Sequence, residues 1–105
     1  MESIRPSELA ERLQRGDKLV LLDVRRHNEL EICVLPNVVH LPLSDLDQGH
    51  HILDPDDVIV CICHHGIRSA QACTMLESYG FDGVINLTGG MELWAQEMDP
   101  EMARY

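Results

Sequence analysis

The chain has 105 residues, 45% of them hydrophobic, and a formal net charge of −10 at pH 7. This length predicts one domain over residues 1–105, and the acidic balance argues against nucleic acid and anionic membranes as partners. No apolar run approaches the roughly 20 residues that span a bilayer, and the first residues lack the apolar segment of a signal peptide, so we expect a cytoplasmic protein with four reduced cysteines.

The N-terminal half alternates helical patterns with short apolar runs. Pro6, at a first helical position, predicts a helix that ends at Gly16, with Arg5 as a poor N-cap. The other elements expected here are a strand at 19–24, a short helix at 28–33, a strand at 38–41, a helical turn at 45–47 capped by Ser44, and a polar loop at 48–57.

The C-terminal half repeats the alternation around a more apolar run. An uncharged strand over 58–62 leads through a polar turn into a helix over 69–79, which Gly80 ends in the left-handed conformation. A strand at 84–87, a Gly-Gly turn and a helix at 91–98 complete the chain, and a polar tail follows. Strands that alternate with helices predict a parallel sheet covered on both faces, a three-layer α/β/α fold.

Cys63 lies where the most apolar strand gives way to a helix. The carboxyl ends of strands are where α/β sheets place their ligand sites. A free thiol is only a few per cent ionised at neutral pH, so a nucleophilic cysteine needs groups that stabilise the thiolate. Gly66 permits the positive φ of an anion-binding backbone nest, and Arg68 is expected to add a fixed cation at its rim. The turn therefore predicts a thiolate nucleophile that can also carry a second sulfur.

Four segments of the chain resemble those of rhodanese-like sulfurtransferases. They are the loop CHHGIRS at 63–69, LLDVR at 21–25, LPNVVHLPL at 35–43 and NLTGGMELW at 86–94. Val34 stands where the family usually has His, and Asn37 where it usually has Gly. Because Asn tolerates the left-handed conformation, we expect the turn at Asn37 to survive.

This resemblance implies a five-stranded parallel sheet and a sulfur atom carried on Cys63 as a persulfide. The sulfur would come from a small donor such as thiosulfate or a persulfide and pass to cyanide or to the thiol of a small molecule or protein, with no cofactor or metal. The residues implied to bind the substrate are His64, His65, Gly66, Ile67 and Arg68. Asp23, Arg25 and Ser69 would support the site.

Two other functions compete with sulfur transfer. Cysteine phosphatases and arsenate reductases use loops with five residues between Cys and Arg, whereas four residues, 64–67, separate Cys63 from Arg68 here. The smaller loop suits a single sulfur better than a phosphate. A non-catalytic interaction module is the other alternative, and an acidic surface suits a protein partner better than dianionic thiosulfate, unless Arg25, Arg26 and Arg68 offset the charge locally. We therefore expect modest thiosulfate activity.

Several other residues have more ordinary interpretations. Cys61 is interpreted as a core residue, with a resolving thiol as the alternative, and His64 and His65 either contact an anionic substrate when protonated or are plain loop residues. A zinc site from Cys61, Cys63, His64 and His65 is disfavoured, because alternate strand residues followed by two neighbours do not converge tetrahedrally. The residues expected only to pack, to line a groove or to face solvent are Cys33, Cys73, Trp94, His50, His51, Asp45, Asp47, Asp54, Asp56 and Asp57.

Overall fold

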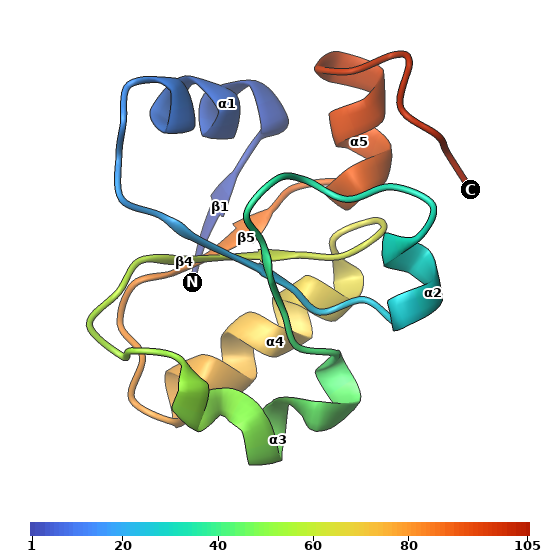
Figure 1. Ribbon diagram of the computed structural model, residues 1–105. Helices are drawn as coiled ribbons and strands as arrows, with labels where there is room; N and C mark the ends of the chain where they lie inside the picture. Colours follow the sequence, from blue (N-terminus) through green and yellow to red (C-terminus); the bar gives the residue numbers. More distant parts are fainter.

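The computed structural model describes residues 1–105 and contains one five-stranded sheet in which all neighbouring strands are parallel (Figure 1). The strand order is β1-β5-β4-β2-β3. The strands are β1 (Glu2–Ile4), β2 (Val20–Asp23), β3 (Val39–His40), β4 (Ile59–Ile62) and β5 (Val84–Leu87). The predicted five-stranded α/β/α fold is confirmed.

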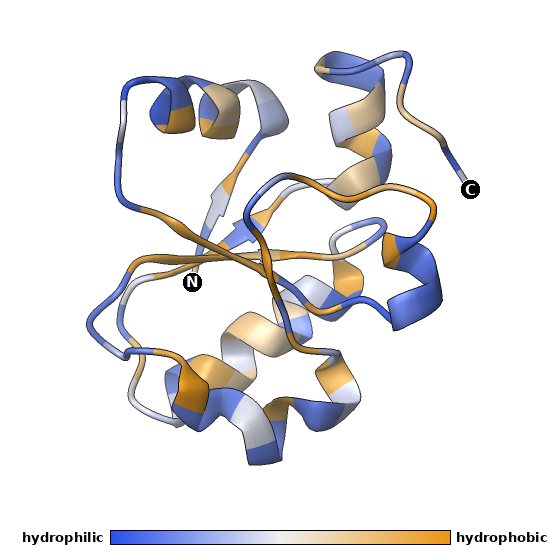
Figure 2. Ribbon diagram, viewed as in Figure 1, coloured by the Kyte–Doolittle hydropathy of each residue, from blue (hydrophilic) through white to orange (hydrophobic).

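Helices cover both faces of the sheet (Figure 1). One face packs against α1 (Pro6–Gln14) and α5 (Gly90–Glu97), and the other against α3 (Leu46–Gly49) and α4 (Ile67–Ser78). Side chains alternate along β4, so Val60 and Ile62 belong to the core on the side of α1 and α5, whereas Ile59 and Cys61 belong to the core on the side of α3 and α4. Figure 2 shows the central strands as hydrophobic along most of their length, as expected of a sheet buried on both sides.

No helix in the structure is both long enough and apolar enough to cross a bilayer.

Several element boundaries shift by one or two residues, so that the helix expected at 69–79 is α4 at Ile67–Ser78, and three larger differences remain. β1 was not expected as a strand, since it has three residues and only one of them is buried. The helix expected at 28–33 is a single turn, α2 (His27–Leu30). The segment 48–57 was expected to be a loop, but residues 48–52 are helical: α3 ends at Gly49, and a 3₁₀ turn over His50–Ile52 follows it. A second 3₁₀ turn, over Leu43–Asp45, precedes α3, and Ser44 does not provide the expected cap.

Two details of local conformation follow from these elements. The ring of His50 stacks on Tyr79 with centroids 3.9 Å apart, so the expectation of a solvated loop histidine was wrong. Asn37 has φ +63°, as expected for the residue in place of the family's usual glycine, and the turn at 35–37 is kept.

The candidate site lies where the sheet topology reverses. From β2 the chain moves to the edge strand β3, whereas from β4 it moves to β5 on the other side. The crevice between the carboxyl ends of two such neighbouring strands is the usual ligand position in open α/β sheets. The register pairs Asp23 with Ile62, so the segment after β2 and the loop after β4 leave the sheet side by side.

Candidate active site

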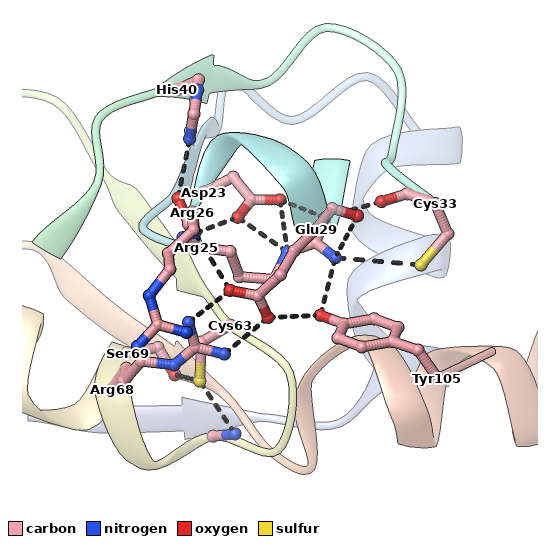
Figure 3. Close-up of polar contacts among 11 residues, drawn as sticks. Asp23, Arg25, Arg26, Glu29, Cys33, His40, Cys63, Arg68, Ser69 and Tyr105 are labelled. Carbon is pink, nitrogen blue, oxygen red and sulfur yellow. Dashed lines mark hydrogen bonds and ion pairs between the residues drawn. The ribbon is translucent and has the colours of Figure 1, made fainter. Parts of the chain in front are cut away.

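The sulfur of Cys63 lies against the start of helix α4 (Figure 3). The backbone N–H of Gly66 donates a hydrogen bond to Sγ at 3.0 Å, and the hydroxyl of Ser69 lies 3.2 Å from it. Gly66 reaches this position with φ +98°, a left-handed conformation that favours glycine. The first amides of a helix have no carbonyl partner in a preceding turn and carry the positive end of the helix dipole. The sulfur is thus in contact with neutral hydrogen-bonding groups, although Cys63 is only 1% exposed.

Ser69 links the sulfur to Asn86 on β5. The Ser69 hydroxyl donates to the side-chain oxygen of Asn86, whose amide nitrogen donates to the carbonyl of Gly66 at 3.1 Å. A hydroxyl has one proton to donate, so while Ser69 donates to Asn86 it can only accept from the Cys63 thiol. Once Cys63 is a thiolate, Ser69 can turn its proton toward the sulfur. Asn86 therefore competes with the sulfur for the Ser69 proton.

The start of α5 fixes the same loop from the other side. The N–H groups of Met91 and Glu92 donate to the carbonyls of Cys63 and His64 at 2.9 and 3.0 Å. Gly90 has φ +57°, and a Cβ at this position would lie 2.6 Å from the carbonyl oxygen of His64. Only glycine fits this close approach, which explains the turn expected at Gly89–Gly90. The loop conformation is therefore set by two helix starts.

Arg68 binds a carboxylate from α2. Its two terminal nitrogens donate to the two oxygens of Glu29 at 2.6 and 2.8 Å, a bidentate ion pair (Figure 3). The hydroxyl of Tyr105 also donates to Glu29, at 2.7 Å. The Arg68 hydrogen bonds hold the pKa of Glu29 far below its usual range, and burial raises the pKa of Tyr105 to about 12. At neutral pH Glu29 is ionised and Tyr105 keeps its proton.

Asp23 and Arg25 form a second ion pair that is fully buried. The Arg25 guanidinium donates to the two Asp23 oxygens at 2.9 and 2.7 Å, and to the carbonyl of Cys33 at 2.7 Å. Its remaining terminal nitrogen donates to the Tyr105 hydroxyl at 3.0 Å, which joins this pair to Glu29. These contacts tie the end of β2 to the segment after α2, a geometry that is consistent with the expected supporting role.

The two histidines of the loop differ in their surroundings. The ring of His64 stacks on Tyr105 with centroids 3.7 Å apart and an angle of 9°, whereas His65 is exposed. Burial and the neighbouring His65 lower the pKa of His64, so it is neutral at pH 7. Its buried Nε2 has no hydrogen-bond partner. Ile67, the next residue expected to bind substrate, is 72% exposed.

Three residues of the site were not identified from the sequence: Glu29, Asn86 and Tyr105. Glu29 lies in the short acidic helix, and Asn86 lies in a segment that the family resemblance already includes. Neither sequence pattern indicated which residue these side chains would contact. Tyr105 lies in the tail that was expected to be merely polar. All three reach the site across long sequence separations, of 39, 17 and 76 residues.

The remaining cysteines lie outside the loop at 63–69. Cys61 is fully buried, and contact with Cys73 together with burial raises the pKa of its thiol, which opposes nucleophilic chemistry there. Cys73 is also in the core, and Cys33 is half-buried. Trp94 lines an apolar groove of about 370 Å³ between α1 and α5, as expected for a groove-wall residue. The five aspartates expected at the surface are exposed.

Comparison with known proteins places this chain in a family. The model of the rhodanese-like domain matches residues 5–97. The chain belongs to the rhodanese-like family. It is 33% identical over 101 residues to "Putative sulfurtransferase YtwF" of Bacillus subtilis, covering 96% of this chain and 97% of that protein.

Solved rhodanese-like structures agree with the fold. A rhodanese-related protein from Thermoplasma volcanium is 32% identical, with a TM-score of 0.85 and coverage of 93% of this chain and 94% of the other. A rhodanese-like domain protein from Staphylococcus aureus is 27% identical, with a TM-score of 0.86 and coverage of 100% and 99%. The relatives named as sulfurtransferases support sulfur transfer as the general class of activity for this rhodanese-like chain.

Proposed function

We propose that this rhodanese-like chain is a sulfurtransferase that carries a sulfane sulfur on Cys63. The observation that supports this best is the position of Sγ, which accepts a hydrogen bond from Gly66 at the start of α4. Four residues separate Cys63 from Arg68, which makes a loop sized for a single sulfur atom. The binding roles of His64, His65, Gly66, Ile67 and Arg68 remain predictions.

Transfer takes two steps. The Cys63 thiolate attacks the outer sulfur of thiosulfate, a sulfur–sulfur bond forms, and the bond to the sulfonate breaks as sulfite leaves with the electron pair. Cyanide or a thiolate then attacks the outer sulfur of the Cys63 persulfide and leaves as thiocyanate or a new persulfide, which restores the Cys63 thiolate. With a persulfide donor the leaving group of the first step is a thiolate. No net oxidant or reductant is consumed.

Access to the sulfur is restricted, because Cys63 is 1% exposed. A groove of about 270 Å³ lies beside the loop and is large enough for a small donor. The groove is lined by Val24, Arg26, Pro42, Leu43, Ser44 and Arg68. Cys63 does not line this groove, so Sγ must become more exposed before a donor in the groove can reach it.

A small thiol or a protein is the acceptor that we propose. The chain is 35% identical to "Probable adenylyltransferase/sulfurtransferase MoeZ" of Mycobacterium tuberculosis, of which it covers only 27%. It is 37% identical over 84 residues to "Putative sulfur carrier protein YrkF" of Bacillus subtilis, of which it covers 45%. These names, with the acidic surface, support a protein acceptor. The chemistry needs a free thiol, so we propose that the chain acts in a reducing compartment such as the cytoplasm.

The test is an assay of sulfur transfer from thiosulfate to cyanide. We expect Cys63→Ser to abolish thiocyanate formation while the fold is kept, because the hydroxyl is not ionised at neutral pH. Cys33→Ser is the matched control, since it removes a half-buried thiol outside the loop, and it should retain activity. Full activity of Cys63→Ser would remove the nucleophile assignment, and competitive block by low vanadate with phosphatase activity would favour the alternative oxyanion chemistry.

A further inference from the structure

The charged groups beside the catalytic loop cancel one another. Two guanidinium groups each bind both oxygens of a carboxylate: that of Arg25 binds Asp23, and that of Arg68 binds Glu29 (Figure 3). Tyr105 joins the pairs by accepting from Arg25 and donating to Glu29. The side chains of Asp23 and Arg25 are fully buried, and that of Glu29 is 8% exposed. The network therefore brings no net charge to the sulfur.

This arrangement leaves Arg68 with little attraction for a dianionic donor. Both of its terminal nitrogens already donate to Glu29, at 2.6 and 2.8 Å. At least one of these charge-assisted hydrogen bonds must break or be shared before Arg68 can bind a substrate. Arg26 lines the same groove but is exposed, where salt and water screen its charge. His64 is neutral at pH 7, and the chain as a whole has a formal net charge of −10. Thiosulfate, with two negative charges, therefore gains little from the paired Arg68, and the overall charge of the chain repels it.

We propose that Glu29 is a specificity-determining residue: with Tyr105 holding it in place, it occupies Arg68 and so directs Cys63 toward persulfide donors rather than thiosulfate. The inference rests on the proposed sulfur transfer and deepens it by naming the donor class. A persulfide group carries at most one negative charge: the Cys63 thiolate takes the outer sulfur of the protonated persulfide with its proton, the sulfur–sulfur bond breaks, and a thiolate leaves with the electron pair. Glu29 acts through Arg68 and is a positioning residue.

The experiment compares two donors, thiosulfate and cysteine persulfide, in the whole chain. Glu29→Gln keeps the shape of the side chain and removes its charge, which frees the charge of Arg68. We expect the KM for thiosulfate to fall about fivefold, the effect of one unpaired charge near the surface, with kcat little changed. The KM for cysteine persulfide should stay the same, so the preference between donors shifts toward thiosulfate.

A second variant covers the case in which Glu29→Gln does not fold. Tyr105→Phe removes one hydrogen bond to Glu29, keeps the ring that stacks on His64, and should shift the donor preference in the same direction by less, about twofold. Glu97→Gln is the matched control, because it removes one arginine-paired carboxylate at the far end of α5. It should leave the preference unchanged.

The outcomes separate this inference from the proposed function. If neither donor loads sulfur on the wild-type chain, the proposed function fails and the inference fails with it. If the wild-type chain is loaded but Glu29→Gln and Tyr105→Phe leave the donor preference unchanged, the role of Glu29 is overturned and sulfur transfer stands. An equal shift in Glu97→Gln also overturns it, because the effect would then come from the overall charge.

Discussion

The two sides of the cysteine loop are built from different kinds of groups. On the side of α4 and β5, neutral donors and acceptors surround the sulfur: the Gly66 amide, the Ser69 hydroxyl and, behind them, Asn86. On the side of α2, two ion pairs and Tyr105 form a continuous network that ends at Arg68 (Figure 3). One loop thus separates a neutral region from a charged one.

This difference assigns different tasks to the two sides. Neutral dipoles fixed by the backbone can stabilise a thiolate or a persulfide without a counterion that competes with the substrate. Buried ion pairs, in contrast, hold segments together, and they cost stability when one partner is lost. We therefore expect changes on the charged side to affect folding and donor choice, and changes on the neutral side to affect the transfer step.

The largest effect is expected from breaking the buried pair. Arg25→Met leaves the Asp23 carboxylate buried without its partner, and this should reduce the free energy of unfolding by about 3–5 kcal/mol. The measurement is urea unfolding at pH 7. Arg15→Met is the control, because Arg15 pairs with Asp17 at the surface, where an ion pair contributes little.

The double variant Asp23→Leu/Arg25→Met tests whether the loss of stability comes from the unpaired buried charge. Removing both charges should lose less stability than Arg25→Met alone, because no unpaired charge stays buried. Equal losses in the Arg25 and Arg15 variants would contradict the structural role of the charged side.

Acid should weaken the fold in two steps, one from His64 and one from Glu29. Burial lowers the pKa of His64 in the folded chain, whereas in the unfolded chain this pKa is about 6.5. As pH falls below that value, the unfolded chain binds a proton more readily than the folded chain, so the free energy of unfolding decreases. The Arg68 hydrogen bonds lower the pKa of Glu29, so its contribution is present above about 4.3 and is lost as pH falls below that.

Unfolding free energies measured between pH 7.5 and 3.5 separate these steps. His64→Phe, which keeps an aromatic ring against Tyr105, should remove the decrease between pH 7 and 5.5. Glu29→Gln should reduce the decrease below pH 5. A wild-type stability that is constant between pH 7 and 5.5 would contradict the effect assigned to His64.

A smaller effect is expected on the neutral side. Ser69→Ala removes one hydrogen bond at the sulfur, worth about 0.5–1.5 kcal/mol, and should slow persulfide formation roughly 2- to 10-fold. Thr74→Ala, on the exposed side of the same helix, is the control. An unchanged rate in Ser69→Ala would show that the hydroxyl does not act on the sulfur.

Local patterns predicted the parts of this protein that depend on nearby residues. The strand at 84–87 matches β5, Gly80 adopts the left-handed conformation with φ +94°, and Gly66 makes the turn after Cys63. Apolar runs and glycines carry this information within a few residues. β1 escaped detection because one buried residue in three gives no periodicity, and its place is fixed by pairing with β5 at the other end of the chain.

Contacts between segments far apart in the sequence could not be predicted from the sequence alone. Arg68 was expected to add a fixed cation at the rim of the loop, but its charge is paired with Glu29, which lies 39 residues away in the sequence. Similarly, nothing near Tyr105 indicates that its hydroxyl reaches Arg25 and Glu29. Motif spacing predicted which thiol is the nucleophile, whereas the charge balance around it could be seen only in the fold.

The most direct test of the central claim is the intact mass of the protein after exposure to a sulfur donor. We predict a gain of one sulfur atom that a reductant removes, that is absent in Cys63→Ser and that maps to the peptide containing Cys63. A gain that persists in Cys63→Ser, or that maps to Cys33, Cys61 or Cys73, would contradict it.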